Sequence, residues 1–287
     1  MFGTRGLGST LTRPTGTAHH DRMDIQTFPN LSRPGVGQKP RRESQRPLLP
    51  QHSRHCPVLE AGSGLGMLVY APLEPNESIN IEFLGDGKYD FHYLLAGPGG
   101  RWQEIFSVLF ILPVGSLGMV REEVTFKIPN PPITKEGAVR MAGALISNDD
   151  LGTPPGGVTF KGATGFKTPK GWDTVYGPVL NMIERPLAPM LVVRVETDWY
   201  PHESEFRYVL QPGEALSANH HLPIGQVHFV PREEIVLRES TEEEVLAVRK
   251  AREDFVKGKA ATKLMTKYGL QYSPHYARQS RTFNDAK

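Results

Sequence analysis

Histidines and carboxylates recur in the second half of this chain of 287 residues, which contains ten histidines in all. Asp198, His202, His220 and His228 follow or lie on segments that alternate like strands. Imidazole and carboxylate groups are common ligands of iron and zinc, and two histidines with one carboxylate suffice for an iron site. If these strands close into a barrel, the four residues converge. The chain would then be a metal-dependent enzyme of the double-stranded β-helix type, with iron or zinc, or a small-molecule binder.

The spacing of these residues departs from the cupin pattern. In cupins two histidines one residue apart precede a glutamate, and a third histidine follows after a longer gap. Here His220 and His221 are adjacent, and adjacent residues of an extended strand point to opposite faces. The sequence therefore favours histidines in loops and on the surface over a metal centre.

Two tryptophans stand beside carboxylates, in Trp172-Asp173 and Asp198-Trp199. Such pairs can form the aromatic wall of a ligand pocket, but a tryptophan more often fills the core at a domain rim, and we favour that role. The run from Gly62 to Gly66 lacks the lysine and the following helix of a phosphate loop, so a tight turn or bulge is predicted there.

Strands must position these residues. Apolar and polar residues alternate from Pro57 onward, and the clearest hairpin joins Glu77–Leu84 to Tyr89–Leu95. Further strands are predicted at Met67–Ala71, Glu104–Val114, Val124–Ile128, Met190–Tyr200, Glu205–Leu210 and Gly225–Val230. The pattern predicts a mainly β fold, either an antiparallel β-sandwich or a jelly-roll-like barrel, with one C-terminal helix and an extended N-terminal arm.

Two further regions have weaker strand patterns. Residues 134–172 are rich in glycine and are predicted to form a surface excursion with a short helix at Lys135–Ile146. Thr241 and Glu244 have capping-box spacing and begin the one well-marked helix. A second helical piece is predicted at Ala260–Tyr268. We divide the chain into an arm (1–56), a β-rich core (57–239), a helical segment (240–268) and a C-terminal tail (269–287).

The predicted arm is basic and rich in proline. Residues 1–56 hold nine basic and three acidic residues, a net charge of +6, whereas the rest has 24 basic and 28 acidic residues, a net charge of −4. Without a periodic apolar face, such a segment gains too little burial to fold alone. We expect a partner surface to order it. The candidate docking residues are Arg5, Arg13, Arg22, Arg33, Lys39, Arg41, Arg42 and Arg46.

The chain has a single cysteine, Cys56, which rules out a disulfide within it and favours a reducing compartment. Its longest apolar run, Ile105 to Val114, is too short to cross a bilayer. The N-terminus lacks a secretory signal. We therefore expect a protein that is cytoplasmic during synthesis, neither secreted through a signal peptide nor transmembrane.

Several motifs, taken in order, resemble an uncharacterised bacterial and phage family known only as a domain of unknown function, from about Arg54 to Asn284. The motifs run from His55 to Ala61, from Gly171 to Thr174, from Val195 to Trp199, from Pro223 to Pro231 and from Ser280 to Asn284. The family has no established activity, so the resemblance implies neither a reaction nor a catalytic residue. The proline-rich leader and the histidines after Pro201 depart from its pattern and suggest a member recruited into an assembly.

These observations lead to three hypotheses. The first is a non-enzymatic component of a large assembly, such as a capsid decoration or tail-associated protein of a phage virion, without a cofactor. Its partners would be other protein subunits, including copies of itself. The second is the metal-dependent enzyme described above. The third is nucleic-acid binding through the arm, which ranks last because the arm offers only Phe2 and Phe28 for base stacking.

Overall fold

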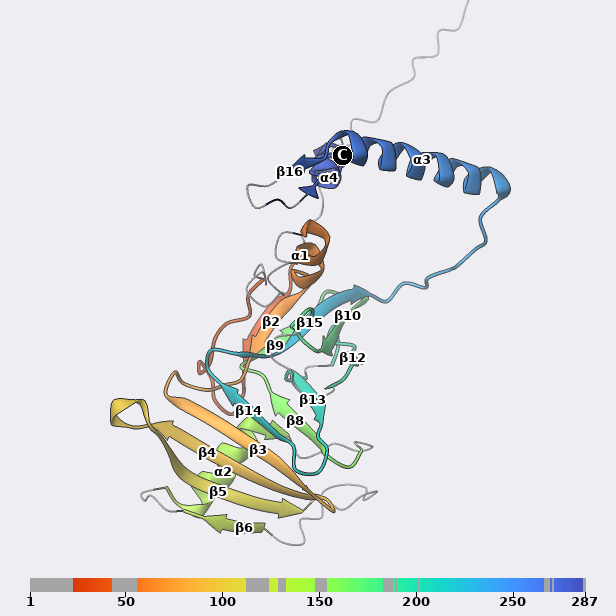
Figure 1. Cartoon of the computed structure of the whole chain (residues 1–287). Helices are drawn as coiled ribbons and strands as arrows, with labels where there is room; N and C mark the ends of the chain where they lie inside the picture. The colour runs from red at the N-terminus through yellow and green to blue at the C-terminus, as the bar shows by residue number, and fades with distance from the viewer. Residues whose placement is uncertain are drawn as a thin grey trace, which may run out of the picture.

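The computed structural model describes residues 23–42, 56–111, 124–128, 133–147, 154–182, 188, 190–200, 202–265, 269 and 271–285. These residues form antiparallel sheets, four α-helices and one 3-10 turn. Figure 1 shows the larger sheets gathered into one body, with the longest helix and the C-terminal two-stranded sheet standing apart from it. The predicted mainly β, sandwich-type fold is therefore confirmed.

The described strands form five sheets, all with antiparallel pairing. The five-stranded sheet has the order β14 (Ala215–Asn219), β3 (Glu77–Gly85), β4 (Lys88–Ala96), β5 (Trp102–Ile111) and β6 (Val124–Lys127). The first four-stranded sheet has the order β12 (Val193–Val195), β10 (Trp172–Gly177), β15 (Pro223–Pro231) and β2 (Met67–Tyr70). The second has the order β11 (Met190–Leu191), β13 (Glu205–Val209), β8 (Gly157–Lys161) and β7 (Ile146–Ser147). The two-stranded sheets pair β1 (Gln26–Pro29) with β9 (Thr164–Lys167), and β16 (Leu264–Met265) with β17 (Gln271–Tyr272).

The helices are α1, α2, α3 and α4, and the 3-10 turn follows β4. Their bounds are α1 (Pro57–Ser63), α2 (Lys135–Leu145), α3 (Glu242–Ala261), α4 (His275–Asp285) and the turn Pro98–Gly100. No described helix has the length and apolar character needed to cross a membrane.

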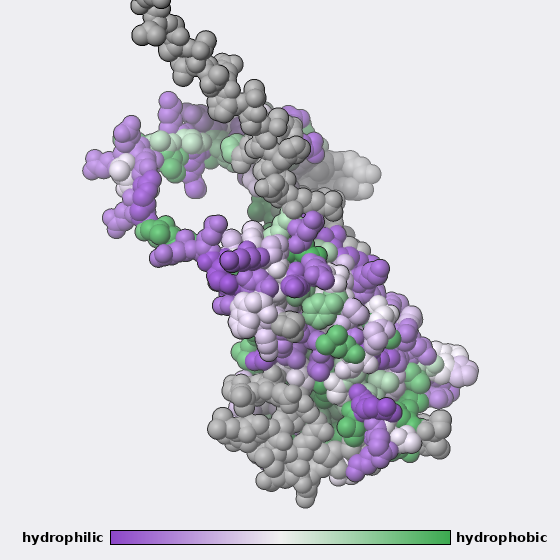
Figure 2. All heavy atoms as spheres, turned by 180° about the vertical axis from the view of Figure 1, so that it is seen from behind, coloured by the Kyte–Doolittle hydropathy of each residue, from purple (hydrophilic) through white to green (hydrophobic). Residues whose placement is uncertain are grey.

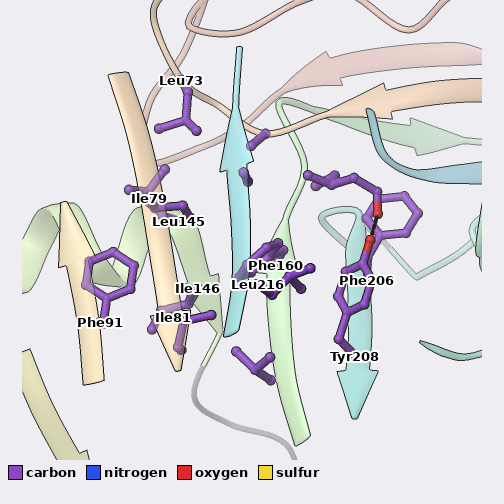
Figure 3. Close-up of a cluster of buried hydrophobic side chains, with 14 of the residues drawn as sticks. Leu73, Ile79, Ile81, Phe91, Leu145, Ile146, Phe160, Phe206, Tyr208 and Leu216 are labelled. Atoms are coloured by element: carbon purple, nitrogen blue, oxygen red, sulfur yellow. Dashed lines mark hydrogen bonds between the residues drawn. The ribbon is translucent and has the colours of Figure 1, made fainter. Parts of the chain in front are cut away.

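The β3–β4 hairpin forms as predicted. Gly85, Asp86 and Gly87 all have positive φ, which closes the tight turn, and Ile79, Ile81 and Phe91 are completely buried. Side chains from β8, β13 and α2 meet them in one core, part of which Figure 3 shows. Burial of each large apolar side chain contributes about 1.5–3 kcal/mol, so this shared core binds the separate sheets into one body.

The prediction of a surface excursion at 134–172 is wrong. This region contains α2, β7, β8 and β9, and Val158, Phe160 and Phe166 are buried. Its glycines reflect close packing: a Cβ on Gly162 would lie 2.0 Å from Ser204 Oγ. Glycine content therefore marked closely packed strands here and not a loop.

The predicted arm also differs from the expectation, because its residues 23–42 lie on the core of their own chain. β1 pairs with β9 in register from Gln26 to Pro29, and Arg41 forms a β-bridge with Leu68. Asn30 is 1% exposed and donates its side-chain N–H to the carbonyl oxygen of Gly162. Polar contacts with distant residues hold this segment in place. A search for a periodic apolar face does not detect contacts of this kind.

The C-terminal helix α3 begins with the predicted capping box, in which Thr241 and Glu244 bond each other's backbone N–H groups. The second helical piece predicted at 260–268 is wrong, because α3 ends at Ala261 and β16 follows. Helix α4 lies entirely within the predicted C-terminal tail, for which no helix was expected. Figure 1 shows α3 connected to β15 by an extended stretch, residues 232–241, which we call the linker.

Candidate functional site

The four predicted metal ligands each have another neighbour. Asp198 accepts hydrogen bonds from the Gly171 N–H and from Arg232. The His202 ring stacks on Tyr200 and lies 3.4 Å from the Glu205 carboxylate. The His220 ring nitrogen Nδ1 is 2.7 Å from the carbonyl oxygen of Leu73. His228 lies on β15 opposite Val175, where burial lowers its pKa.

The structure does not bring these four residues together. Within the described part of the chain, no group of three or more His, Cys, Asp and Glu side chains is arranged to hold a metal ion. The expected convergence assumed that all four side chains point into one barrel. Instead His220 turns toward Leu73 and Asp198 turns toward the end of β15, so they serve separate contacts.

Asp198 belongs to a different cluster, which we call the arginine clamp: Asp173, Arg194, Asp198 and Arg232. Asp173, on β10, is 2% exposed and accepts from Arg194 Nε at 2.6 Å and from Arg232 Nε at 2.9 Å. Arg232 Nη2 also donates to Asp198 at 2.8 Å. Hydrogen bonds from Arg232 are the main reason that the pKa values of both carboxyl groups lie below their usual range.

The clamp fixes the start of the linker. The Arg232 N–H donates to the carbonyl oxygen of Gly171 at 2.8 Å, which extends the β15–β10 contact by one residue. A depression of about 310 Å³ beside the clamp is lined by Asp173, Arg194, Glu196, Arg232 and Glu233. Three carboxylates against two guanidinium groups give this depression no excess positive charge for an anion. We therefore interpret the clamp as an anchor for the C-terminal segment.

Replacing Asp173 with alanine should lower the free energy of unfolding by about 2 kcal/mol and make the linker more sensitive to protease. Two arginines lose a buried acceptor, but both are partly exposed and can be rehydrated, so the cost falls below the 3–5 kcal/mol of a fully buried pair. Urea unfolding and limited proteolysis would measure both effects. Glu196→Ala is the matched control, since Glu196 is half exposed and 3.7 Å from Arg232, and it should change stability by less than about 0.5 kcal/mol.

The aromatic neighbour of Asp198 is not part of the core. Trp199 is 68% exposed, so the core role predicted for it is wrong, and its indole N–H bonds the Glu196 carboxylate. Trp172 is partly buried at the start of β10. Neither residue lines the depression beside the arginine clamp.

The predicted docking residues divide into two groups. Arg5, Arg13, Arg22 and Arg46 lie outside the described residues. Among the other four, Arg33, Arg41 and Arg42 contact their own body, which departs from the expectation that they face a partner. Arg41 Nε donates to the Tyr70 hydroxyl at 3.0 Å, and Arg42 Nε donates to the Gly64 carbonyl oxygen at 2.9 Å. Lys39 is exposed.

Arg33 makes the strongest of these contacts. Its two terminal nitrogens donate to the two oxygens of Glu77, each at 2.8 Å, and one also reaches the Pro72 carbonyl oxygen. The Tyr93 hydroxyl donates to the same carboxylate. Burial alone would raise the pKa of Glu77, but the hydrogen bonds from Arg33 and Tyr93 more than offset this and lower it. A buried, charged pair therefore joins residues 23–42 to β3.

The folded-back segment 23–42 encloses a groove on the body, which we call the arm groove. One wall is formed by residues 23–25 and 27–29 and the other by residues 35–40, and the floor is formed by Met67, Phe166 and Phe229. Its volume is about 570 Å³, within the range of pockets that bind small ligands or side chains. Sequence reasoning missed this site because the two walls are ordered by contacts with strands far away in the chain.

Exposed apolar residues concentrate in the C-terminal segment. Ile235, Val236 and Leu237 in the linker are 85%, 78% and 90% exposed. All residues of α3 are described and none is buried, although Val248 and Val256 belong to its apolar stripe. Figure 2, the view from behind, shows a hydrophobic patch between hydrophilic stretches of the linker, which stands clear of the body. Such exposure is unusual for a subunit that acts alone.

Comparison of the chain with protein-family models, with curated protein sequences and with solved structures finds no match in any of the three.

Proposed function

We propose that this protein is a structural subunit of a protein assembly, and that residues 232–285 dock it onto neighbouring protein subunits. The observation that carries the proposal is the exposure of the linker and α3. Helix α3 contacts α4, where the rings of Phe255 and His275 lie 4.9 Å apart, but none of its 20 residues is buried, so it has little of the packing that normally stabilises helices in water. Docking would supply that packing to Val245, Val248 and Val256.

The way in which the segment is mounted supports the same proposal. The arginine clamp holds the linker at Arg232, and Arg238 binds the Glu244 carboxylate at 2.6 and 2.8 Å at the start of α3. The exposed apolar residues Ile235, Val236 and Leu237 therefore lie between a contact with the body at Arg232 and a contact with α3 at Arg238. An exposed apolar segment that projects from the folded body can contact neighbouring subunits.

The finer proposal is that this assembly is a phage virion and that the protein works there without a cofactor. It draws on the expectation, from the order of the sequence motifs, of a resemblance to a bacterial and phage family and on the net charge of +6 of residues 1–56. The genes next to this one provide a direct check: capsid and tail genes would support the virion, and genes for metabolic enzymes would contradict it.

Photo-crosslinking tests the docking role of α3. A photoreactive amino acid at Val248, on the apolar stripe, should give crosslinked protein adducts in cells of the source organism. The matched control is the same amino acid at Lys250, an exposed position two residues later and about 160° away around the helix. We expect about tenfold more adduct from position 248, the ratio that a free-energy difference of about 1.4 kcal/mol between buried and exposed positions gives. Equal yields from the two positions, or adducts with nucleic acid alone, would contradict the proposal.

A further inference from the structure

We propose that the linker of one copy inserts Ile235, Val236 and Leu237 into the arm groove of a second copy. The inference rests on the proposed function and deepens it by naming a partner and its site. The contact joins two different surfaces of identical chains. Repetition of such a contact closes into a ring or continues as a chain, and both are assemblies.

The donor segment has the properties of an insertion peptide. Its three apolar residues are consecutive and at least 78% exposed, and they are flanked by Glu233 and Glu234 on one side and Arg238 on the other. Because one end of the segment is bonded to the body at Arg232 and the other to α3 at Arg238, less conformational entropy is lost when it binds than for a free tail.

The acceptor matches the donor in chemistry. The floor of the arm groove is apolar and aromatic, from Met67, Phe166 and Phe229, and therefore suits branched aliphatic side chains. The two walls carry opposite charges: Lys39 on one can attract Glu233 or Glu234 of an incoming linker, and Asp24 on the other can attract its Arg238.

Sheet order argues for a second copy and against the chain's own linker. In the sheet β12-β10-β15-β2, the backbone and side chain of Arg232 are bonded toward Gly171 and Asp173 at the β10 side. The groove lies toward the opposite side, where Met67 of β2 forms part of the floor. The linker therefore leaves the body away from its own groove.

Complementation between two defective variants tests this contact. Val236→Asp places a charge in the donor and leaves the groove intact. Thr27→Glu places a charge in the groove and leaves the donor intact. Thr27 is an exposed residue of β1, and Gln26→Glu on the outward side of the same strand is the matched control, because Gln26 does not line the groove. All four full-length proteins would be compared by size-exclusion chromatography with light scattering.

We expect oligomers from the wild type and from Gln26→Glu, and monomers from each defective variant alone. Mixing Val236→Asp with Thr27→Glu should give a one-to-one heterodimer, since one supplies the groove and the other the linker. A labelled peptide of residues 232–240 should bind the Val236→Asp protein at least about tenfold more tightly than a Thr27→Glu/Val236→Asp protein.

Three results would overturn the inference: a monomeric wild type, a defective variant that keeps the wild-type oligomer, or a mixture of the two variants that stays monomeric. Peptide binding to Val236→Asp combined with a monomeric wild type would indicate that the groove takes the chain's own linker, which also overturns it. None of these results removes crosslinks from Val248, so the proposed function is tested separately.

Discussion

Replacing Arg33 with alanine is expected to lower the free energy of unfolding by about 3 kcal/mol and to open residues 23–42 to proteases. Glu77 is 6% exposed, and the substitution leaves its carboxylate buried with only the Tyr93 hydroxyl and a backbone N–H as donors. Removing one partner of a buried ion pair usually costs about 3–5 kcal/mol. The lower end applies here because two donors to the carboxylate remain.

Urea unfolding gives the free energy, and limited proteolysis followed by mass spectrometry locates the first cut. Arg42→Ala is the control, because Arg42 is exposed and bonds one backbone oxygen, so a change below about 0.5 kcal/mol is expected. The Arg33→Ala/Glu77→Ala protein should be more stable than the sum of the two single losses of unfolding free energy predicts. In the double variant, neither charged group is left without its partner. Equal stability of Arg33→Ala and Arg42→Ala would refute the role of the pair.

Local patterns explain which elements were predictable from the sequence. The β3–β4 hairpin and the start of α3 are each specified by residues close together in the sequence, the first by alternation around a Gly-Asp-Gly turn and the second by Thr241 with Glu244. The strand at Met67–Tyr70 and helix α2 were found in the same way. These elements need no distant residue to decide their conformation.

Distant contacts decide the parts that sequence reasoning missed. Residues 23–42 have the composition of a disordered segment, yet Arg33 meets Glu77 and Asn30 meets Gly162, pairs separated by 44 and 132 residues. No periodic pattern encodes such pairs. The arm groove depends on the same contacts, so the sequence did not indicate it. The predicted convergence of Asp198 with the histidines failed for a related reason, because the direction in which a side chain points depends on strand register.

The conformation of the glycine-rich run before β2 depends both on local sequence and on a distant contact. It was predicted as a turn or bulge, and the structure places helix α1 in its first half, with Gly64 as the C-terminal cap and Gly66 at φ +71°. A Cβ on Gly66 would lie 1.9 Å from the Val227 carbonyl oxygen. Gly66 thus lets β2 approach β15 closely, which aligns Met67 and Phe229 in the floor of the groove.

Replacing Gly66 with alanine should therefore lower the free energy of unfolding by about 3 kcal/mol. The positive φ costs about 1–2 kcal/mol for a residue with a Cβ, and the collision with a backbone oxygen adds about 1–3 kcal/mol because a backbone atom cannot rotate away. Denaturant unfolding would measure the loss, and hydrogen exchange should show faster exchange in β2. Gly64→Ala is the control two residues earlier: its φ is −82° and its nearest neighbour would be 3.5 Å away, so little change is expected.

The same substitution should also weaken the contact between copies if the arm groove is its acceptor. Displacing β2 from β15 separates Met67 from Phe229. A Gly66→Ala/Val236→Asp protein should therefore no longer form the heterodimer with Thr27→Glu, under conditions in which it is still folded. A Gly64→Ala/Val236→Asp protein should still form it. A folded Gly66→Ala/Val236→Asp protein that still pairs with Thr27→Glu would show that the floor of the groove does not hold the linker. The role of Gly66 would then be limited to stability.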